Sequence, residues 1–270
     1  MLLIRNKQFI WLLMLRKDNL EKIEKQDSTI IEKEILFFEK IAEEWRNPNG
    51  KLKNIYQFNN ARCNYFLTEV CEILDLDIND NLPLKGLSIL DIGCGAGLIA
   101  EYLCLLGAHV TGIDASEKNI QIASAHAQKY NLKINYKNCL TEEIIDQKKS
   151  FDIVLNTEVV EHVSNQKKLI KQCTECTKVN GIIIIATINK TIMSFFKAIL
   201  GAEYILRLLP RGTHNWNYFV KPQEIINIFN ENNVKTLKIK GMSYNPLFNK
   251  WSITKKLDVN YYIVARKIIS

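Results

Sequence analysis

The amino-acid sequence predicts an open α/β fold, in which helices cover both faces of a mostly parallel sheet of seven strands. Three observations favour this fold: strand and helix patterns alternate after Pro83, a glycine-rich turn directly follows the first strand pattern, and Asp114 ends the second. Alternation of this kind produces a parallel sheet with helices on both faces. Because open α/β folds bind ligands at the carboxyl ends of their strands, we expect a ligand site where the turn and Asp114 lie.

The chain is long and apolar enough for one large domain with appendages. Its 270 residues are 47% hydrophobic and 24% charged, which allows a substantial buried core. We expect an N-terminal extension over residues 1–27, a helical cover over 28–80 and the main domain over 81–270, with an apolar insertion at 189–216. The apolar stretch at 9–15 is too short to span a bilayer and lacks a small-residue cleavage site. The extension is therefore interpreted as mobile or as a membrane-touching tail, without a role in the chemistry.

The expected elements follow from the spacing of apolar residues and from turn signals. Two helices, over residues 30–45 and 61–74, precede the sheet and are expected to cover its mouth. The seven strands are predicted over residues 87–91, 109–114, 133–136, 151–156, 181–187, 236–240 and 261–266. The last two should form a hairpin-like pair at one edge. Helices are predicted over 98–106 and from a cap at Ser116 to Tyr130, because a serine hydroxyl can accept a hydrogen bond from the free amides of a first helical turn.

The glycine-rich turn, Asp91-Ile-Gly-Cys-Gly-Ala-Gly97, is expected to seat a cofactor. Gly93 and Gly95 lack Cβ atoms at points where the backbone must turn sharply and approach a ligand. The spacing is GxGxG and not the GxGxxG of dinucleotide folds. Asp91, two positions before the first glycine, suits a cofactor with a cationic amino-acid end and no pyrophosphate, and Asp114 could accept both hydroxyl hydrogens of a ribose. The alternative interpretation is a tight turn without a ligand.

Three polar residues after the fourth predicted strand are candidates for the chemistry of the site. If residues 158–162 form a helical turn, Glu158, Glu161 and His162 share one face, because they stand at i, i+3 and i+4. Two carboxylates and an imidazole could hold a hard divalent ion that lowers the pKa of vicinal hydroxyl groups of a substrate. His162 could instead be a general base. A solvated helix start, with carboxylates favoured by the helix dipole, is the third interpretation.

Charge and cysteine content narrow the functional classes. The net charge is +7, from 36 Lys and Arg against 29 Asp and Glu, and the basic residues are scattered along the chain. This pattern suits an anionic membrane surface or a solvated exterior as readily as nucleic acid. We expect no nucleic-acid partner, because no helix-turn-helix, RNA-binding or zinc-finger pattern is present. The seven cysteines indicate reduced thiols in a cytoplasm, and the pair Cys173-x-x-Cys176 is interpreted as helix-borne cysteines rather than as a zinc site.

The insertion at 189–216 is apolar nearly all the way round a helical wheel, while Lys190, Lys197 and Arg211 fall close to one line. It is too short and too charged to span a membrane. We expect an interfacial segment that rests in lipid and admits an apolar substrate, with buried core as the alternative.

The turn resembles the first motif of class I methyltransferases, in which this loop holds the methionine part of S-adenosylmethionine. Longer stretches resemble the O-methyltransferases of ubiquinone biosynthesis, from about residue 35 to 265. The matching stretches are Leu90-Asp-Ile-Gly-Cys-Gly-Ala-Gly97, Val110-Thr-Gly-Ile-Asp114, Glu158-Val-Val-Glu-His-Val163, Gly201-Ala-Glu-Tyr-Ile-Leu-Arg207, Pro210, Gly212-Thr-His214, Tyr244-Asn-Pro246 and Asp258-Val-Asn-Tyr261. The Gly201–Arg207 run, together with Gly212-Thr-His214, is the most specific of them.

This resemblance implies a class I methyltransferase fold with S-adenosylmethionine as cofactor and with Mg²⁺ as an open alternative. It implies cofactor contacts from Arg62, Gly93, Asp114 and Thr157, and Glu158, Glu161 and His162 as candidate magnesium ligands. This chain departs from the family where paired tryptophans are usual, at Trp45-Arg46, and where Asn-Pro-x-Arg is usual, at Asn59-Asn-Ala-Arg62. Thr157 stands where many relatives carry a larger apolar residue.

The implied reaction is methyl transfer to a phenolic hydroxyl of 2-polyprenyl-6-hydroxyphenol and of 3-demethylubiquinol. The implied partners are the polyprenylated phenol or quinol, an anionic membrane surface and other ubiquinone-biosynthesis enzymes, and the implied location is cytoplasmic, at the inner face of the membrane. Three alternatives stay open: a class I methyltransferase for another small hydroxylated aromatic, a nicotinamide oxidoreductase, and a non-catalytic lipid-bound assembly protein. The oxidoreductase is disfavoured by the missing GxGxxG and by the final strand pair.

Overall fold

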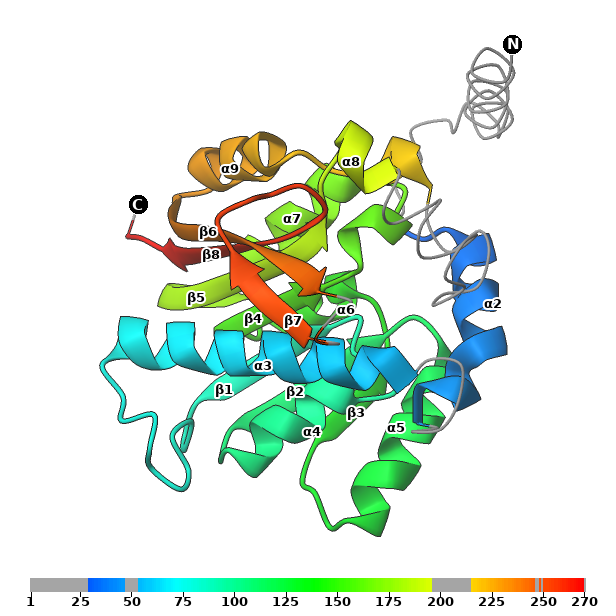
Figure 1. The fold of residues 1–270 in the computed structure, drawn as a ribbon. Helices are drawn as coiled ribbons and strands as arrows, with labels where there is room; N and C mark the ends of the chain where they lie inside the picture. The colour runs from blue at the N-terminus through cyan, green and yellow to red at the C-terminus, as the bar shows by residue number, and fades with distance from the viewer. Residues whose placement is uncertain (1–28, 47–52, 196–214, 246–247, 249, 270) are drawn as a thin grey trace.

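The computed structural model describes residues 29–46, 53–195, 215–245, 248 and 250–269 (Figure 1). The predicted extension at 1–27 and most of the predicted insertion at 189–216 lie outside these residues. The division of the chain at residues 28 and 81 stays a prediction.

The described strands form one sheet in the order β3-β2-β1-β4-β5-β8-β6-β7. Strands β1 to β5 pair in parallel, and β8, β6 and β7 pair antiparallel at the other side. The predicted class of fold is confirmed. The strands are β1 Ser88–Ile92, β2 His109–Asp114, β3 Asn135–Asn138, β4 Phe151–Thr157, β5 Thr177–Ile188, β6 Val234–Asn245, β7 Lys250–Thr254 and β8 Asn260–Lys267.

The predicted count of seven strands is wrong, because β7 turns back on the end of β6 and adds an eighth strand. The predicted pairing of the last two strand patterns is confirmed, since β6 and β8 pair antiparallel. Their predicted position at the edge is wrong: β8 lies between β5 and β6, and β7 is the edge strand. The third strand also starts later than predicted, at Asn135.

The helices lie largely where the apolar spacing predicts them. The serine cap of α5 is confirmed, because the Ser116 hydroxyl accepts a hydrogen bond from the Asn119 amide at 3.2 Å. Helix α3 starts at Lys53, well before the predicted residue 61. The described helices are α2 Glu32–Ile41, η1 Ala42–Arg46, α3 Lys53–Leu74, α4 Leu98–Leu105, α5 Glu117–Lys129, α6 Thr141–Asp146, η2 Val160–His162, α7 Gln166–Glu175, α8 Ile192–Ser194, η4 Trp216–Tyr218 and α9 Pro222–Glu231.

The core forms two layers because successive strand residues point to opposite faces of the sheet. In β5, Ile182 and Ile184 belong to the core layer that contains α3 and α4. The alternating residues Ile183 and Ile185 belong to the layer that contains α6, α7 and α9. All four side chains are fully buried. Helix α3 therefore packs on a face of the sheet and does not cover its mouth.

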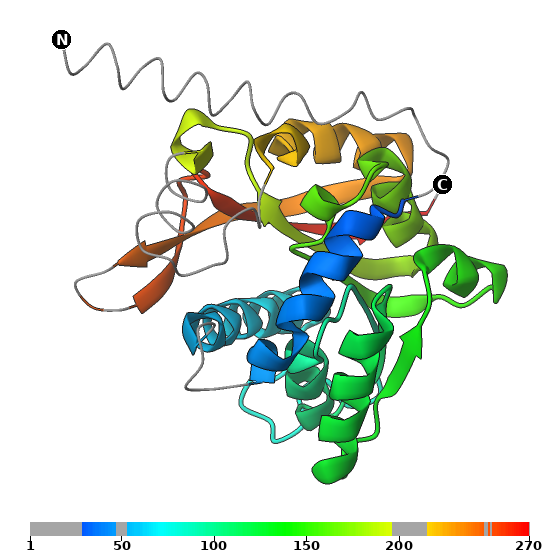
Figure 2. The ribbon, with the colours of Figure 1, turned by 90° about the vertical axis from the view of Figure 1, so that its right-hand side faces the viewer.

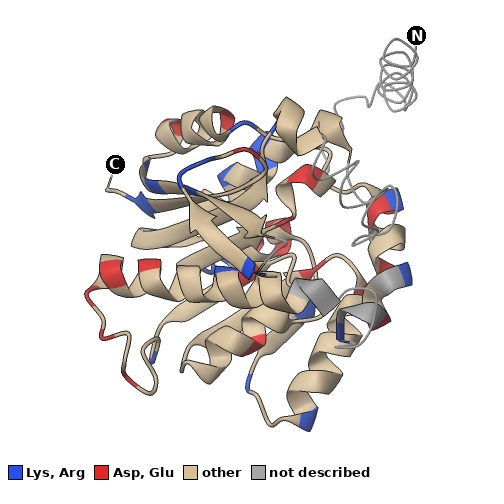
Figure 3. Ribbon diagram, viewed as in Figure 1, with Lys and Arg blue, Asp and Glu red and all other residues tan. Residues whose placement is uncertain are grey.

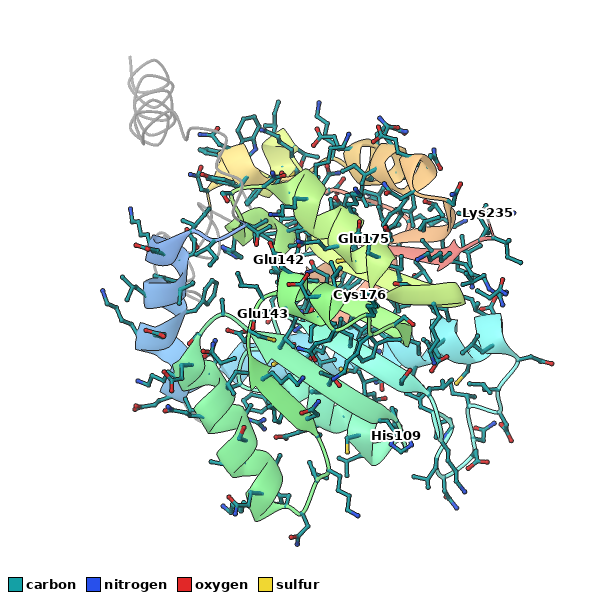
Figure 4. All side chains as sticks on the ribbon, turned by 180° about the vertical axis from the view of Figure 1, so that it is seen from behind. His109, Glu142, Glu143, Glu175, Cys176 and Lys235 are labelled. Atoms are coloured by element: carbon teal, nitrogen blue, oxygen red, sulfur yellow. The ribbon has the colours of Figure 1, made fainter. Side chains whose placement is uncertain are left out.

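The mouth is covered by α2 and η1 alone among the described helices before β1. Figure 2 shows α2 running across one edge of the sheet. His109, the first residue of β2, lies on the side away from α2 (Figure 4), so that β2 runs toward the cover. Lys and Arg are spread over several elements of the described chain and form no single block in Figure 3. The cover, defined here as residues 32–46, therefore lies over the carboxyl edge, where the sequence predicts the ligand site.

Candidate active site

The glycine turn is fixed to the neighbouring strand β2 by its own backbone. The amides of Gly93 and Cys94 both donate to the Ile113 carbonyl, at 2.8 and 3.0 Å. Gly93 and Gly95 have φ angles of 71° and 53°, in the left-handed region that favours glycine. A Cβ atom at Gly93 would lie only 2.3 Å from Cγ2 of Val159. Gly93 is therefore required both for its backbone angle and for its lack of a side chain.

Asp114, at the end of β2, connects this turn to the start of α5. Its carboxylate accepts hydrogen bonds from the Gly95 amide at 2.9 Å and the Ser116 amide at 2.8 Å, and from Nδ2 of Asn119 at 3.3 Å. Burial raises the pKa of Asp114, and these hydrogen bonds oppose the rise. A carboxylate has about four acceptor positions, so these three hydrogen bonds leave capacity for about one ribose hydroxyl group. The predicted ribose acceptor thus lies against the predicted cofactor turn.

Asp91 lies in the last part of β1 and is fully buried. Neither of its carboxylate oxygens has a hydrogen-bond partner among the described residues. Burial raises its pKa to about 7, the positive charge of Arg62 lowers it, and the Asp114 carboxylate raises it. A buried carboxylate without partners is costly unless a ligand satisfies it. The ammonium group of an amino acid would do so.

Arg62 is the complementary cation, on α3. It is buried, and its Nε and Nη1 atoms have no hydrogen-bond partner in the described part of the chain. Its guanidinium lies 5.0 Å from the ring centroid of Phe58, and Nη1 lies 4.0 Å from Oε1 of Glu158. A guanidinium with unused N–H groups can bind a carboxylate with two parallel hydrogen bonds. Arg62 and Asp91 together therefore match an amino-acid zwitterion.

The end of β4 adds two buried polar residues to the site. Asn156 pairs with Ile92 in the β1–β4 register, beside the start of the glycine turn, and both polar atoms of its side chain are without partners in the described residues. Thr157 follows it and is buried, and its contact with the cofactor stays a prediction. Asn156 was not predicted, although a polar residue at the end of an apolar strand is the signal that could have indicated it.

The helical turn predicted over residues 158–162 is not formed at its start. Glu158 has a φ of 57°, in the left-handed region, and η2 begins only at Val160. Glu158 accepts from Nδ2 of Asn260 at 3.3 Å, and Glu161 accepts from the Thr187 hydroxyl at 2.6 Å. Nδ1 of His162 lies 3.0 Å from Oε2 of Glu34, on the cover.

The predicted single face of Glu158, Glu161 and His162 is therefore wrong. In the described part of the chain, no three His, Cys, Asp or Glu side chains are grouped so that they could hold a metal ion. The three side chains do not fit a magnesium site in this arrangement, and we derive no step through a metal. The role of His162 as a general base stays a prediction.

S-adenosylmethionine combines an ammonium group, a carboxylate and a ribose in one molecule, and Asp91, Arg62 and Asp114 fit these three groups in turn. The parallel sheet with its antiparallel strand β8 beside β5 supplies the matching scaffold. Fold and site together define a class I S-adenosylmethionine-dependent methyltransferase.

Comparison with known proteins agrees with this class. A family model described as a methyltransferase domain matches residues 90–185. The chain is 49% identical over 234 residues to the ubiquinone biosynthesis O-methyltransferase of Pelagibacter ubique, which covers 87% of this chain and 97% of that protein. It is 42% identical over 246 residues to the protein of the same name from Bartonella bacilliformis, with 91% and 99% covered. The chain belongs to the family of ubiquinone biosynthesis O-methyltransferases.

Solved structures agree on the fold. The magnesium protoporphyrin IX methyltransferase of Synechocystis PCC 6803 with bound S-adenosylmethionine superposes with a TM-score of 0.58, at 16% identity over 89% of this chain and 99% of that chain. The same enzyme with bound S-adenosylhomocysteine gives a TM-score of 0.54, at 22% identity over 75% and 82%.

We expect Gly93→Ala to lower the affinity for S-adenosylhomocysteine by at least about tenfold, because the new Cβ would displace Val159 and distort the turn. Gly86→Ala is the matched control: Gly86 also has a positive φ, of 83°, but nothing lies within 4 Å of its Cβ position. Calorimetric titration measures both affinities. Both variants should lose about 1–2 kcal/mol of stability from the strained backbone, and equal loss of affinity in both would contradict the role of the turn.

We also expect the affinity for S-adenosylhomocysteine to rise about tenfold between pH 6 and pH 8, since a pKa of about 7 ionises Asp91 over this range. The sign follows from the ligand, whose ammonium group favours the ionised carboxylate. In Asp91→Asn the affinity should be lower and its pH profile flatter. A wild-type profile as flat as that of the variant would remove Asp91 from the cofactor contacts.

Proposed function

We propose that this chain transfers the methyl group of S-adenosylmethionine to a phenolic hydroxyl of polyprenylated ubiquinone precursors, namely 2-polyprenyl-6-hydroxyphenol and 3-demethylubiquinol. The observation that carries the proposal is the 49% identity to a ubiquinone biosynthesis O-methyltransferase over nearly its full length. The polar side chains at the carboxyl edge support the same type of reaction, because they hold a cofactor where a second molecule can approach from the mouth of the sheet.

In this proposal His162 takes the proton of the phenol. Its Nδ1 faces the Glu34 carboxylate, so in the neutral ring Nδ1–H donates to Glu34 and Nε2 is the nitrogen that would accept a proton. The ring of Phe38 packs edge-on against the imidazole, with 4.9 Å between the ring centroids. These two contacts from α2 fix the orientation of the base. The bound cofactor supplies an electrophilic methyl group on a sulfonium, and the chain contributes alignment and proton removal.

The test is methyl transfer from S-adenosylmethionine to a catechol with a short prenyl chain, with the unprenylated catechol as competitor. Wild type should methylate the prenylated catechol preferentially. His162→Gln should lower kcat by about 10²–10⁴, the usual contribution of a general base, while its affinity for S-adenosylhomocysteine stays within about twofold of wild type. An unchanged kcat would exclude His162 as the base. Equal turnover of both catechols would indicate another hydroxylated aromatic as the substrate.

We further propose that the chain binds an anionic membrane surface near α8, and that an apolar substrate enters there. We propose that other ubiquinone-biosynthesis enzymes bind the chain at the same membrane surface. Among the described helices, none is long and apolar enough to cross a membrane. Ile192 and Met193 are adjacent apolar residues on α8 and are 73% and 45% exposed. Lys190 lies beside them in the chain, with its Nζ over the Trp216 ring at 5.0 Å. Apolar and basic groups in one place favour an anionic interface.

We expect wild type to co-sediment with vesicles that contain an anionic lipid at low salt, and the double variant Ile192→Ser, Met193→Ser to do so several-fold less. Phe195 is unsuitable for this test because it is buried in the protein. Val179→Ser is the matched control, since Val179 is also exposed but lies near the start of β5, whereas α8 follows its end. Equal sedimentation of wild type and the double variant would refute the membrane contact of α8.

A further inference from the structure

Arg46, the last residue of the cover, reaches the glycine turn and the helix that follows it. Its Nε donates to the Ala96 carbonyl at 2.9 Å, and its Nη2 donates to the same oxygen. Its Nη1 donates to Oε2 of Glu101 at 2.8 Å, and Nη2 pairs with Oε1 of the same residue at 2.5 Å. Ala96 is part of the turn, and Glu101 lies in the first turn of α4. One guanidinium thus binds both the glycine turn and the first turn of α4.

The ion pair between Arg46 and Glu101 is almost entirely shielded from water. The side chains of Arg46 and Glu101 are only 13% and 10% exposed, and Nδ1 of His126 lies 2.9 Å from Oε1 of Glu101. A bidentate, charge-assisted pair of this kind is strong and directional, and removing one partner leaves a buried charge. The pair therefore holds the end of the cover to α4 in one geometry.

Among the side chains of the cover that the structure describes, the other polar contacts on this side are weaker. The Ser116 hydroxyl donates to Oε1 of Glu39 at 3.3 Å. Nζ of Lys118 pairs with Oε1 of Glu43 at 3.1 Å, but these side chains are 42% and 81% exposed, so water and salt screen them. Arg46 is therefore the main anchor of the cover on the side of α4 and α5.

Arg46 also complements Asp114 at the turn. Asp114 accepts from the amide of Gly95, and Arg46 donates to the carbonyl of the next residue, Ala96. The turn is thus held at two successive residues, by a carboxylate and by a guanidinium.

We propose that Arg46 is a positioning residue of the cofactor site: it fastens the cover over the glycine turn and sets how long the cofactor stays bound. Each turnover requires one cofactor molecule to enter and its demethylated product to leave past the cover. Loss of the Arg46 contacts should therefore speed release and weaken binding, without impairing the transfer step once the site is filled. The proposal rests on the cofactor and not on the methyl acceptor, so binding of S-adenosylhomocysteine alone tests it.

The experiment measures the dissociation rate of S-adenosylhomocysteine by stopped-flow fluorescence, together with KM for S-adenosylmethionine and kcat. We expect Arg46→Gln to raise the dissociation rate by about tenfold or more, and to raise KM for S-adenosylmethionine while kcat stays within about twofold. Arg46→Lys should be intermediate, because lysine keeps the charge but cannot bind two acceptors with a planar fork. Glu43→Gln is the matched control on the same helix and should release the ligand at the wild-type rate.

A further variant removes the charge of Glu101 as well, so that no buried, unpaired carboxylate destabilises the folded protein. Arg46→Met combined with Glu101→Leu replaces both partners with apolar side chains of similar size, a change that usually preserves stability. It still lacks the donor to the Ala96 carbonyl, and it should also release S-adenosylhomocysteine about tenfold faster. Release at the wild-type rate in this double variant or in folded Arg46→Gln would overturn the proposal. A fall in kcat without a change in release would overturn it as well.

Discussion

The site depends on one constraint, the sharp glycine turn that ends β1 above a buried carboxylate. The turn brings the backbone of Gly93 against Val159 and leaves no room for a side chain there. Beneath it, Asp91 is enclosed without a hydrogen-bond partner among the described residues. The sheet supplies this geometry because β1 is flanked by β2 and β4, whose ends carry Asp114 and Asn156. The proposed cofactor contacts of Asp91 and Asp114 start from these strand ends, and Arg62 adds a contact from α3.

Buried polar groups without partners lower the stability of the ligand-free protein. Burial raises the pKa of Asp91 to about 7 in the folded protein, above the ordinary pKa of an aspartate in the unfolded chain. The contribution of Asp91 to the free energy of unfolding is therefore fully present below that ordinary pKa, and it is lost as pH rises through about 7. Arg62 is likewise buried with unused N–H groups. Polar groups in this state gain most from a ligand that supplies the missing partners. The cofactor and the site thus stabilise each other, and the cover held by Arg46 encloses both.

The fold could be predicted because its signals are local in the sequence. The alternation of strands and helices, the GxGxG turn, the Ser116 cap and the acidic end of β2 each occupy a short window. β7 was missed although Trp251 and Ile253 alternate with polar residues, because the strand has only five residues and three of them are exposed. The start of α3 was missed because its first turns have few apolar residues to reveal a helical period.

The details of the site depend on contacts between distant residues. Glu34 contacts His162, which is 128 residues away in the sequence, and Arg46 contacts Glu101, which is 55 residues away. No periodicity in the sequence predicts such pairs. The expected face of Glu158, Glu161 and His162 failed because Glu158 adopts a left-handed backbone conformation, which ends the strand instead of starting a helix. The cofactor contact of Arg62, which the family resemblance implies, stays a prediction. That its positive charge acts on the buried Asp91 emerged only from the structure.

The most direct test of this account compares two ligands on one variant. 5′-Methylthioadenosine keeps the nucleoside of S-adenosylhomocysteine but lacks its amino-acid end. If Asp91 and Arg62 bind that end, the double variant Asp91→Asn, Arg62→Gln should lose at least about tenfold in affinity for S-adenosylhomocysteine and stay within about twofold for 5′-methylthioadenosine. An equal loss of affinity for both ligands would contradict the account, because it would show that the two side chains support the site as a whole and do not recognise the amino-acid end.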